Sequence, residues 1–234
     1  MGVDSAYFEN LYNLQNNILE IVKSNYLNLY LTGGTALHRF YYKNLRYSED
    51  LDFFSIDGKI DNSFEIILQN NHINYTIESN SNNFKRFVVE KQLKIDIAND
   101  ETPHLDDFIV KDGICLDNKD NILSNKFSAI LSRSEPRDVY DIYILLKYNN
   151  IDKGKIIKSV KEKTADSIDA IFKMLQTFPM NDTLLKDIYF CGDDKKDEFK
   201  KNYFNVIDNF IAKQYLDYTN QNDTTNTHTI KRKR

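Results

Sequence analysis

The stretch Arg46-Tyr47-Ser48-Glu49-Asp50-Leu51-Asp52-Phe53-Phe54 is the most informative part of this sequence. In a β-strand, Asp50 and Asp52 project from one face, and the apolar residues beside them project from the other. Two neighbouring carboxylates repel each other, and a divalent cation relieves that repulsion. Mg²⁺ in particular favours a few carboxylates together with substrate phosphates. The stretch therefore predicts a strand over residues 51–56 with a metal site, although Asp-x-Asp also occurs at exposed strand ends.

The segment before this stretch predicts a phosphate-binding turn. A strand expected over residues 27–31 is followed by Gly33-Gly34-Thr35 and then by a helix expected over residues 36–42. Two glycines allow an anion to approach the backbone closely, and a helix N-terminus supplies N–H donors. The spacing differs from both the G-x-G-x-x-G and the Walker A patterns, which excludes a Rossmann or a P-loop site. A plain tight turn is the alternative for the two glycines.

A third acid follows in Lys94-Ile95-Asp96-Ile97-Ala98. On the strand expected over residues 93–98, Leu93, Ile95 and Ile97 form an apolar face, so Asp96 projects from the opposite face. A carboxylate there could complete a two-metal site, which aligns the attacking and leaving oxygens of a phosphoryl transfer. The alternative is a solvent-facing strand acid.

The rest of the pattern predicts an α+β fold in two parts. Apolar spacing indicates a helix over residues 5–23, a short helix over 62–71, and strands over 73–78 and 84–90 joined by a turn at 79–83. Helices are then expected near residues 119–133, 136–149, 153–163, 165–178 and 196–217. We therefore expect an α/β domain with a small mixed sheet over residues 1–118, a helical bundle over 119–218 and a polar basic tail over 219–234.

Two of these helices carry charged residues beside their apolar stripes. Lys126 and Arg133 are seven residues apart, so they lie on the same side of their helix and could contact an anionic ligand. Asp138 and Asp141 lie on the apolar face of the next helix, where an acid needs a partner, and Lys126 is a candidate. The alternatives are solvated cations and, for Asp138, a favourable interaction with the helix dipole.

Composition limits the class of protein. Of the 234 residues, 41% are hydrophobic and 28% are charged, which excludes a wholly disordered chain. No apolar run approaches the about 20 residues of a membrane span, and the N-terminus lacks the apolar region of a signal peptide. The two cysteines form no C-x-x-C pair, so we expect a cytoplasmic protein. Residues 1–118 hold 10 basic and 18 acidic residues, whereas residues 119–234 hold 21 and 17, an asymmetry that suits a metal site facing a surface for a polyanion.

Several of these motifs together resemble one family. Gly33-Gly34-Thr35-Ala36-Leu37, followed by Arg46-x-Ser48-x-Asp50-x-Asp52-Phe53, resembles the AbiEii/AbiGii toxins of the DNA polymerase beta-like nucleotidyltransferase superfamily. The resemblance continues at Lys126-Phe127-x-Ala129 and at Arg137-Asp138-Val139-Tyr140-Asp141-Ile142, and it spans roughly residues 29–146. It implies a polymerase-beta-like nucleotidyltransferase domain followed by a helical bundle, in the toxin of a bacterial toxin–antitoxin pair.

The resemblance also implies a role for each matching residue. Asp50, Asp52 and Asp96 would be the catalytic carboxylates and would hold Mg²⁺, with two ions expected. The wider superfamily often has Gly-Ser where this chain has two glycines, so a hydroxyl contact to phosphate would come from Thr35 or Ser48. The complete set expected to bind the nucleotide is Gly33, Gly34, Thr35, Arg46, Ser48, Lys126 and Asp138.

The expected reaction is the Mg²⁺-dependent attack of an acceptor hydroxyl on the α-phosphorus of an NTP, with release of pyrophosphate. The expected acceptor is RNA, such as the end of a tRNA, and the expected protein partner is a cognate antitoxin. Two alternatives remain: a transferase that modifies a small molecule or a protein, and a nucleotide-binding module without turnover that acts through partners.

Overall fold

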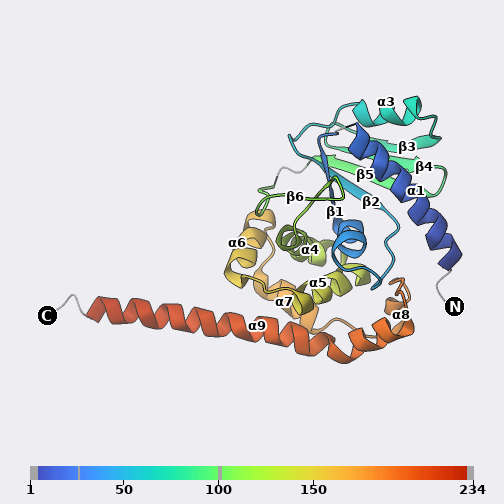
Figure 1. Ribbon diagram of the computed structural model, residues 1–234. Helices are drawn as coiled ribbons and strands as arrows, with labels where there is room; N and C mark the ends of the chain where they lie inside the picture. The colour runs from blue at the N-terminus through green and yellow to red at the C-terminus, as the bar shows by residue number, and fades with distance from the viewer. Residues whose placement is uncertain (1–4, 26, 100–101, 231–234) are drawn as a thin grey trace.

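The computed structural model describes residues 5–25, 27–99 and 102–230, with side chains as far as residue 212. It is an α+β structure in which helices surround one mixed sheet (Figure 1). The strands are β1 (Leu29–Thr32), β2 (Leu51–Ser55), β3 (Tyr75–Asn80), β4 (Phe84–Val89), β5 (Leu93–Asn99), β6 (Ile109–Lys111) and β7 (Ile114–Leu116). The helices are α1 (Ser5–Ser24), α2 (Gly33–Thr35), the π-helix η1 (Ala36–Tyr41), α3 (Ser63–Asn70), α4 (Lys119–Arg133), α5 (Pro136–Tyr148), α6 (Lys153–Lys163), α7 (Ile168–Gln176), α8 (Asp182–Leu185) and α9 (Asp193–Ile230).

The strand order places β2 in the middle of the sheet. In the described chain the order is β3-β4-β5-β2-β1-β7-β6, with β2 parallel to β5 and antiparallel to β1. The register sets Asp52 of β2 beside Thr32 of β1 on one side and beside Asp96 of β5 on the other. Because side chains alternate along a strand, the neighbours of Asp52 and Asp96 are buried in the core while the two acids share the opposite face.

Local signals account for the predicted elements that are confirmed. Helix α4 has the expected bounds because the Asn118 side chain accepts a hydrogen bond from the Asn121 N–H, and Ser134 leaves the helix in a left-handed conformation. Pro136 begins α5, where its missing N–H costs nothing, and Asp152 caps α6 in the same way as Asn118 caps α4. The caps at Asn118 and Asp152 therefore determine where α4 and α6 begin.

The structure also contains elements that the sequence analysis does not predict. Strands β6 and β7 form a hairpin around Asp112 and Gly113, which have φ values of 54° and 81°. Asp-Gly with positive φ at both positions is a favoured two-residue hairpin loop, but strands of three residues show no readable alternation. The short helix α8 is likewise unpredicted, and α9 begins at Asp193 and continues to Ile230 instead of spanning residues 196–217.

The helices of the second half pack against the sheet and against one another. Figure 1 shows α4 to α7 gathered on one side of the sheet, with α9 running past them and projecting beyond the body. A single cluster of buried hydrophobic residues includes members of α1, of the sheet and of α4 to α9. The limits 1–118, 119–218 and 219–234 stay predictions as domain boundaries, and residues 231–234 lie outside the described part. No helix within the described ranges is both long and apolar enough to cross a membrane.

Candidate active site

The carboxylate Asp52 is at the centre of the acidic face of the sheet. Burial, followed by the charges of Asp50 and Asp96, raises its pKa from 3.8 to about 6. Burial also raises the pKa of Asp50, against the opposing effect of nearby cations. The Asp52 carboxylate has no hydrogen-bond or ion-pair partner among the residues that the structure describes. The negative charge of ionised Asp52 is therefore not fully balanced by its neighbours, and a bound metal cation would balance it.

Asp96 differs from Asp52 because a cation already contacts it. Arg86, opposite Asp96 on β4, places its Nε 2.7 Å from Oδ1 and its Nη2 2.7 Å from Oδ2 of that carboxylate. The described residues include no group of three acids, histidines or cysteines arranged to hold a metal ion. Asp50 and Asp52 fit a divalent cation by chemistry, whereas Asp96 can join them only if Arg86 releases at least one of its oxygens.

Close packing explains the two glycines. Gly33 has φ +70°, and a Cβ there would lie 2.6 Å from Asp52 Oδ2, so no side chain fits between this backbone and the acid. A Cβ at Gly34 would lie 2.5 Å from Arg46 Nη2 and 2.9 Å from Ser48 Oγ. The Gly-Gly turn therefore holds the chain against both the acid and the Arg46 side chain, beyond what a plain tight turn requires.

Asp141 is the centre of a buried ion network that joins the two halves of the chain. Arg46 contacts it through two hydrogen bonds, Nε to Oδ1 at 2.8 Å and Nη2 to Oδ2 at 2.7 Å. Lys126 Nζ lies 2.7 Å from Oδ2, and His38 Nε2 lies 2.7 Å from Oδ1. Burial raises the pKa of Asp141, but the charges of Arg46 and Lys126 more than offset it and hold that pKa well below its usual range. Asp141 is therefore ionised, and its negative charge holds the side chains of Arg46 and Lys126 in place.

His38 is a structural member of this network. Burial, followed by the Arg46 charge, lowers the pKa of His38 from 6.5 to about 4, so the imidazole stays neutral at physiological pH. Its other nitrogen, Nδ1, is buried and has no hydrogen-bond partner in the described structure. His38 is therefore a packed residue that is hydrogen-bonded to Asp141.

Asp138, the other acid of α5, contacts two cations beside the cavity. Lys126 Nζ lies 2.6 Å from Asp138 Oδ1, which confirms Lys126 as the partner of the α5 acids. Arg133 Nε lies 2.6 Å from Asp138 Oδ2, and 54% of the Arg133 side chain remains exposed. Lys126 is buried and bound to two carboxylates, so Arg133 is the more accessible of the two cations.

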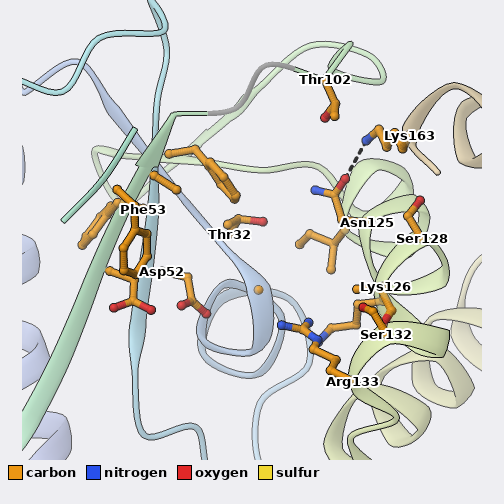
Figure 2. A pocket seen from close by; sticks show the side chains of 17 residues that line it. Thr32, Asp52, Phe53, Thr102, Asn125, Lys126, Ser128, Ser132, Arg133 and Lys163 are labelled. Carbon is orange, nitrogen blue, oxygen red and sulfur yellow. Dashed lines mark hydrogen bonds between the residues drawn. The ribbon is translucent and has the colours of Figure 1, made fainter. Parts of the chain in front are cut away.

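A cavity of about 490 Å³ separates the acidic face of the sheet from these cations (Figure 2). Its volume is typical of a small-molecule site. Figure 2 shows Asp52 on one wall, and Lys126 and Arg133 on the opposite wall. Of the residues predicted for the site, four line it, namely Gly33, Asp52, Asp96 and Lys126.

The other predicted residues do not line the cavity. Thr35 is fully buried, and its hydroxyl donates to the backbone oxygen of Asp50. Ser48 and Arg46 are buried against Gly34. Gly34, Thr35, Arg46, Ser48, Asp50 and Asp138 are all absent from the lining. Asp138 acts on the lining indirectly, because it contacts Lys126 and Arg133.

Several lining residues are not predicted from the sequence. Asn125, Ser128 and Ser132 lie on the face of α4 that also carries Lys126, and Lys163 reaches the cavity from the end of α6. The polar positions at three- and four-residue spacing in α4 were a readable signal for the first three. No local signal connects Lys163 to them, because the contact depends on how α6 packs against α4.

The amino-acid sequence matches one family over most of its length: residues 22–213 match the nucleotidyl transferase AbiEii toxins of type IV toxin–antitoxin systems. The chain belongs to this family. It is therefore a nucleotidyltransferase of the AbiEii toxin family, and the resemblance noted in the sequence is confirmed. No curated protein sequence matches the chain.

Solved structures share the AbiEii fold described above. JHP933 from Helicobacter pylori is 18% identical with a TM-score of 0.58, covering 94% of this chain and 100% of that chain. The nucleotidyltransferase toxin MenT4 from Mycobacterium tuberculosis is 12% identical with a TM-score of 0.56, covering 86% of this chain and 84% of that chain. These likenesses confirm the nucleotidyltransferase fold, and at such identities they show the fold alone.

Proposed function

We propose that this AbiEii-family chain transfers a nucleoside monophosphate from an NTP to a hydroxyl of RNA, such as the end of a tRNA, and releases pyrophosphate. The observation that supports this most directly is the cavity with an acidic wall and a cationic wall. Asp52 and Asp96 line the first, and Lys126, Arg133 and Lys163 line the second. A triphosphate with its divalent cation is a ligand that matches both walls at once.

In this proposal each wall has a separate task. Asp50 and Asp52, with Asp96 once Arg86 has moved, hold Mg²⁺, with two ions expected. The bound Mg²⁺ would activate the acceptor hydroxyl and neutralise developing charge on the phosphates. Arg133 contacts the triphosphate through the part of its guanidinium that Asp138 leaves exposed, and Lys126 supports it from behind. Protein groups mainly position reactants and neutralise charge in such chemistry.

The proposed acceptor and partner are supported by charge and by family membership. An RNA acceptor is supported by the basic excess of residues 119–234 and by the cationic wall that those residues form. Membership of a toxin–antitoxin family supports a cognate antitoxin as partner and the cytoplasm as location. Within the described residues, the geometry of the cavity favours neither of the alternative acceptors, a small molecule or a protein.

The test is transfer of label from each of four α-labelled NTPs to total bacterial RNA in the presence of Mg²⁺, resolved on a gel. We expect labelled RNA with the unaltered protein and none with Asp52→Asn. Label recovered in the protein or small-molecule fraction would overturn the acceptor assignment. A complete absence of NTP binding would overturn the proposal as a whole.

A further inference from the structure

The two ends of the cavity differ in chemistry. Lys126 and Arg133 form an end with two cations next to Asp138, the cationic end, whereas Asn125 and Thr102 form with a single cation, Lys163, a polar end on the other side (Figure 2). Asn125 and Arg133 are eight residues apart on α4, which corresponds to about 12 Å along the helix axis. A nucleotide whose phosphates lie at the cationic end would therefore extend its base toward Asn125.

A relay of hydrogen bonds fixes the orientation of the Asn125 amide. It begins at Asp117, a fully buried carboxylate that accepts from Asn121 Nδ2 at 2.9 and 3.1 Å. The Asn121 Oδ1 must then face the other way, where it accepts from the Leu105 N–H at 3.1 Å and from Lys163 Nζ at 2.6 Å. Because an ammonium group can only donate, the group of Asn125 that lies 2.6 Å from Lys163 Nζ must be its oxygen.

The consequence is a fixed donor at the polar end of the cavity. With Oδ1 held by Lys163, the Nδ2 group of Asn125 points away from Lys163, and Figure 2 shows it directed toward the cavity. It has no hydrogen-bond partner among the described residues. A ligand group that faces it must accept a hydrogen bond, and a ligand amino group there would leave two donors opposed.

We propose that Asn125 reads the nucleobase and selects an exocyclic carbonyl over an amino group on the base edge farthest from the sugar. That edge carries O6 in guanine and O4 in uracil, whereas it carries an amino group in adenine and cytosine. GTP and UTP are then the favoured substrates, and Lys163 is a positioning residue that acts through Asn125. This inference rests on the proposed function, because it assumes that an NTP occupies the cavity.

Matched nucleotide pairs test this contact. ITP and ATP differ at C6, which carries a carbonyl in one and an amino group in the other, and at the adjacent N1, which is a donor in ITP and an acceptor in ATP. UTP and CTP differ in the same way at C4 and N3. We expect calorimetry in Mg²⁺ to show that the unaltered protein binds ITP more tightly than ATP, and UTP more tightly than CTP. Asn125→Ala should weaken ITP and UTP by roughly 3- to 10-fold and leave ATP and CTP nearly unchanged.

Three further variants separate recognition from general damage. Asn125→Asp presents a hydrogen-bond acceptor instead of a donor. Its charge repels every NTP, but the ratio of the ITP and ATP affinities (the ITP/ATP ratio) should invert, so that ATP binds more tightly than ITP. Lys163→Met frees the amide to rotate and should bring the ITP/ATP ratio close to one while Asn125 is intact. Ser128→Ala is the matched control, since its hydroxyl already donates to the Ser124 carbonyl at 2.8 Å, and it should keep the ratio of the unaltered protein.

The outcomes distinguish this inference from the function on which it rests. If the unaltered protein binds none of the NTPs, the proposed function fails. If it binds them but prefers ATP to ITP, or if Asn125→Ala and Asn125→Asp both keep the original ratio, only the base-reading role of Asn125 is refuted.

Discussion

Replacing Asp52 with Asn tests the charge balance of the acidic wall. The pKa of Asp52 is raised from 3.8 to about 6, chiefly by burial and then by Asp50 and Asp96. A carboxyl whose pKa is higher in the folded state than in the unfolded state favours folding only while it is protonated. Stability is therefore lost as the pH rises from about 3.8 to about 6, and this difference in pKa corresponds to about 3 kcal/mol.

The Asp52→Asn variant should not lose stability in this way as the pH rises, because its amide does not ionise. In EDTA, Asp52→Asn should match the unaltered protein in free energy of unfolding near pH 4 and exceed it by up to about 3 kcal/mol at pH 8. Urea titrations at both pH values measure this difference, in which the titrating groups that do not interact with Asp52 cancel. Glu9→Gln, which removes an exposed acid of α1, is the control and should show no such dependence on pH.

The same variant should lose nucleotidyl transfer in Mg²⁺, because its amide cannot replace a carboxylate as a ligand for the cation. A gain in stability that is equal at pH 4 and pH 8 would show that repulsion at Asp52 is not its source. A variant that is less stable at pH 8 would refute the reasoning outright.

Three other changes test the remaining parts of the site. Lys126→Ala should weaken NTP binding by about 10- to 150-fold in calorimetry. If Asp138 acts by orienting Lys126, the double variant Lys126→Ala/Asp138→Ala should bind NTP little worse than Lys126→Ala alone. Fully additive losses of affinity would show that the two residues act independently. Arg86→Gln should tighten the binding of Mn²⁺ in the absence of nucleotide by about tenfold, because both oxygens of Asp96 lose a guanidinium partner. Electron paramagnetic resonance measures this affinity. An unchanged affinity would show that Arg86 does not compete with the metal ion for Asp96. Truncation after Asn220 should leave the melting temperature unchanged and flatten the salt dependence of RNA binding, and a constant salt slope would exclude the tail from RNA capture.

The side-chain placements and helix bounds that were predicted correctly depend on short-range rules. Strand alternation fixes the faces of Asp52 and Asp96 from residues within two positions of each acid. Helix periodicity does the same for Lys126, and the caps at Asn118 and Asp152 explain why helix bounds were predictable. Where the controlling interaction spans only a few residues, the sequence contained the information.

The unpredicted features depend on contacts between distant segments. The Arg46–Asp141 pair joins residues 95 positions apart, and no pattern around Arg46 distinguishes a phosphate ligand from the partner of a buried acid. The Arg86–Asp96 pair was easier to predict, because the register of the β4–β5 hairpin places the two residues directly opposite each other. When that register is not known, the sequence predicts Asp96 as a metal ligand with no competing partner.

The position of Asp141 also limits how this chain can be divided. A cut between residues 118 and 119 would leave Arg46 and His38 on one fragment, and Asp141 and Lys126 on the other. Removing one side of a buried ion pair typically costs about 3–5 kcal/mol, so each fragment alone would carry a buried charge that it cannot satisfy. The α/β half and the helical half are thus poor units for exchange between homologous toxins. Recombination at this point would preserve function only if both parents contributed the same set of buried charges.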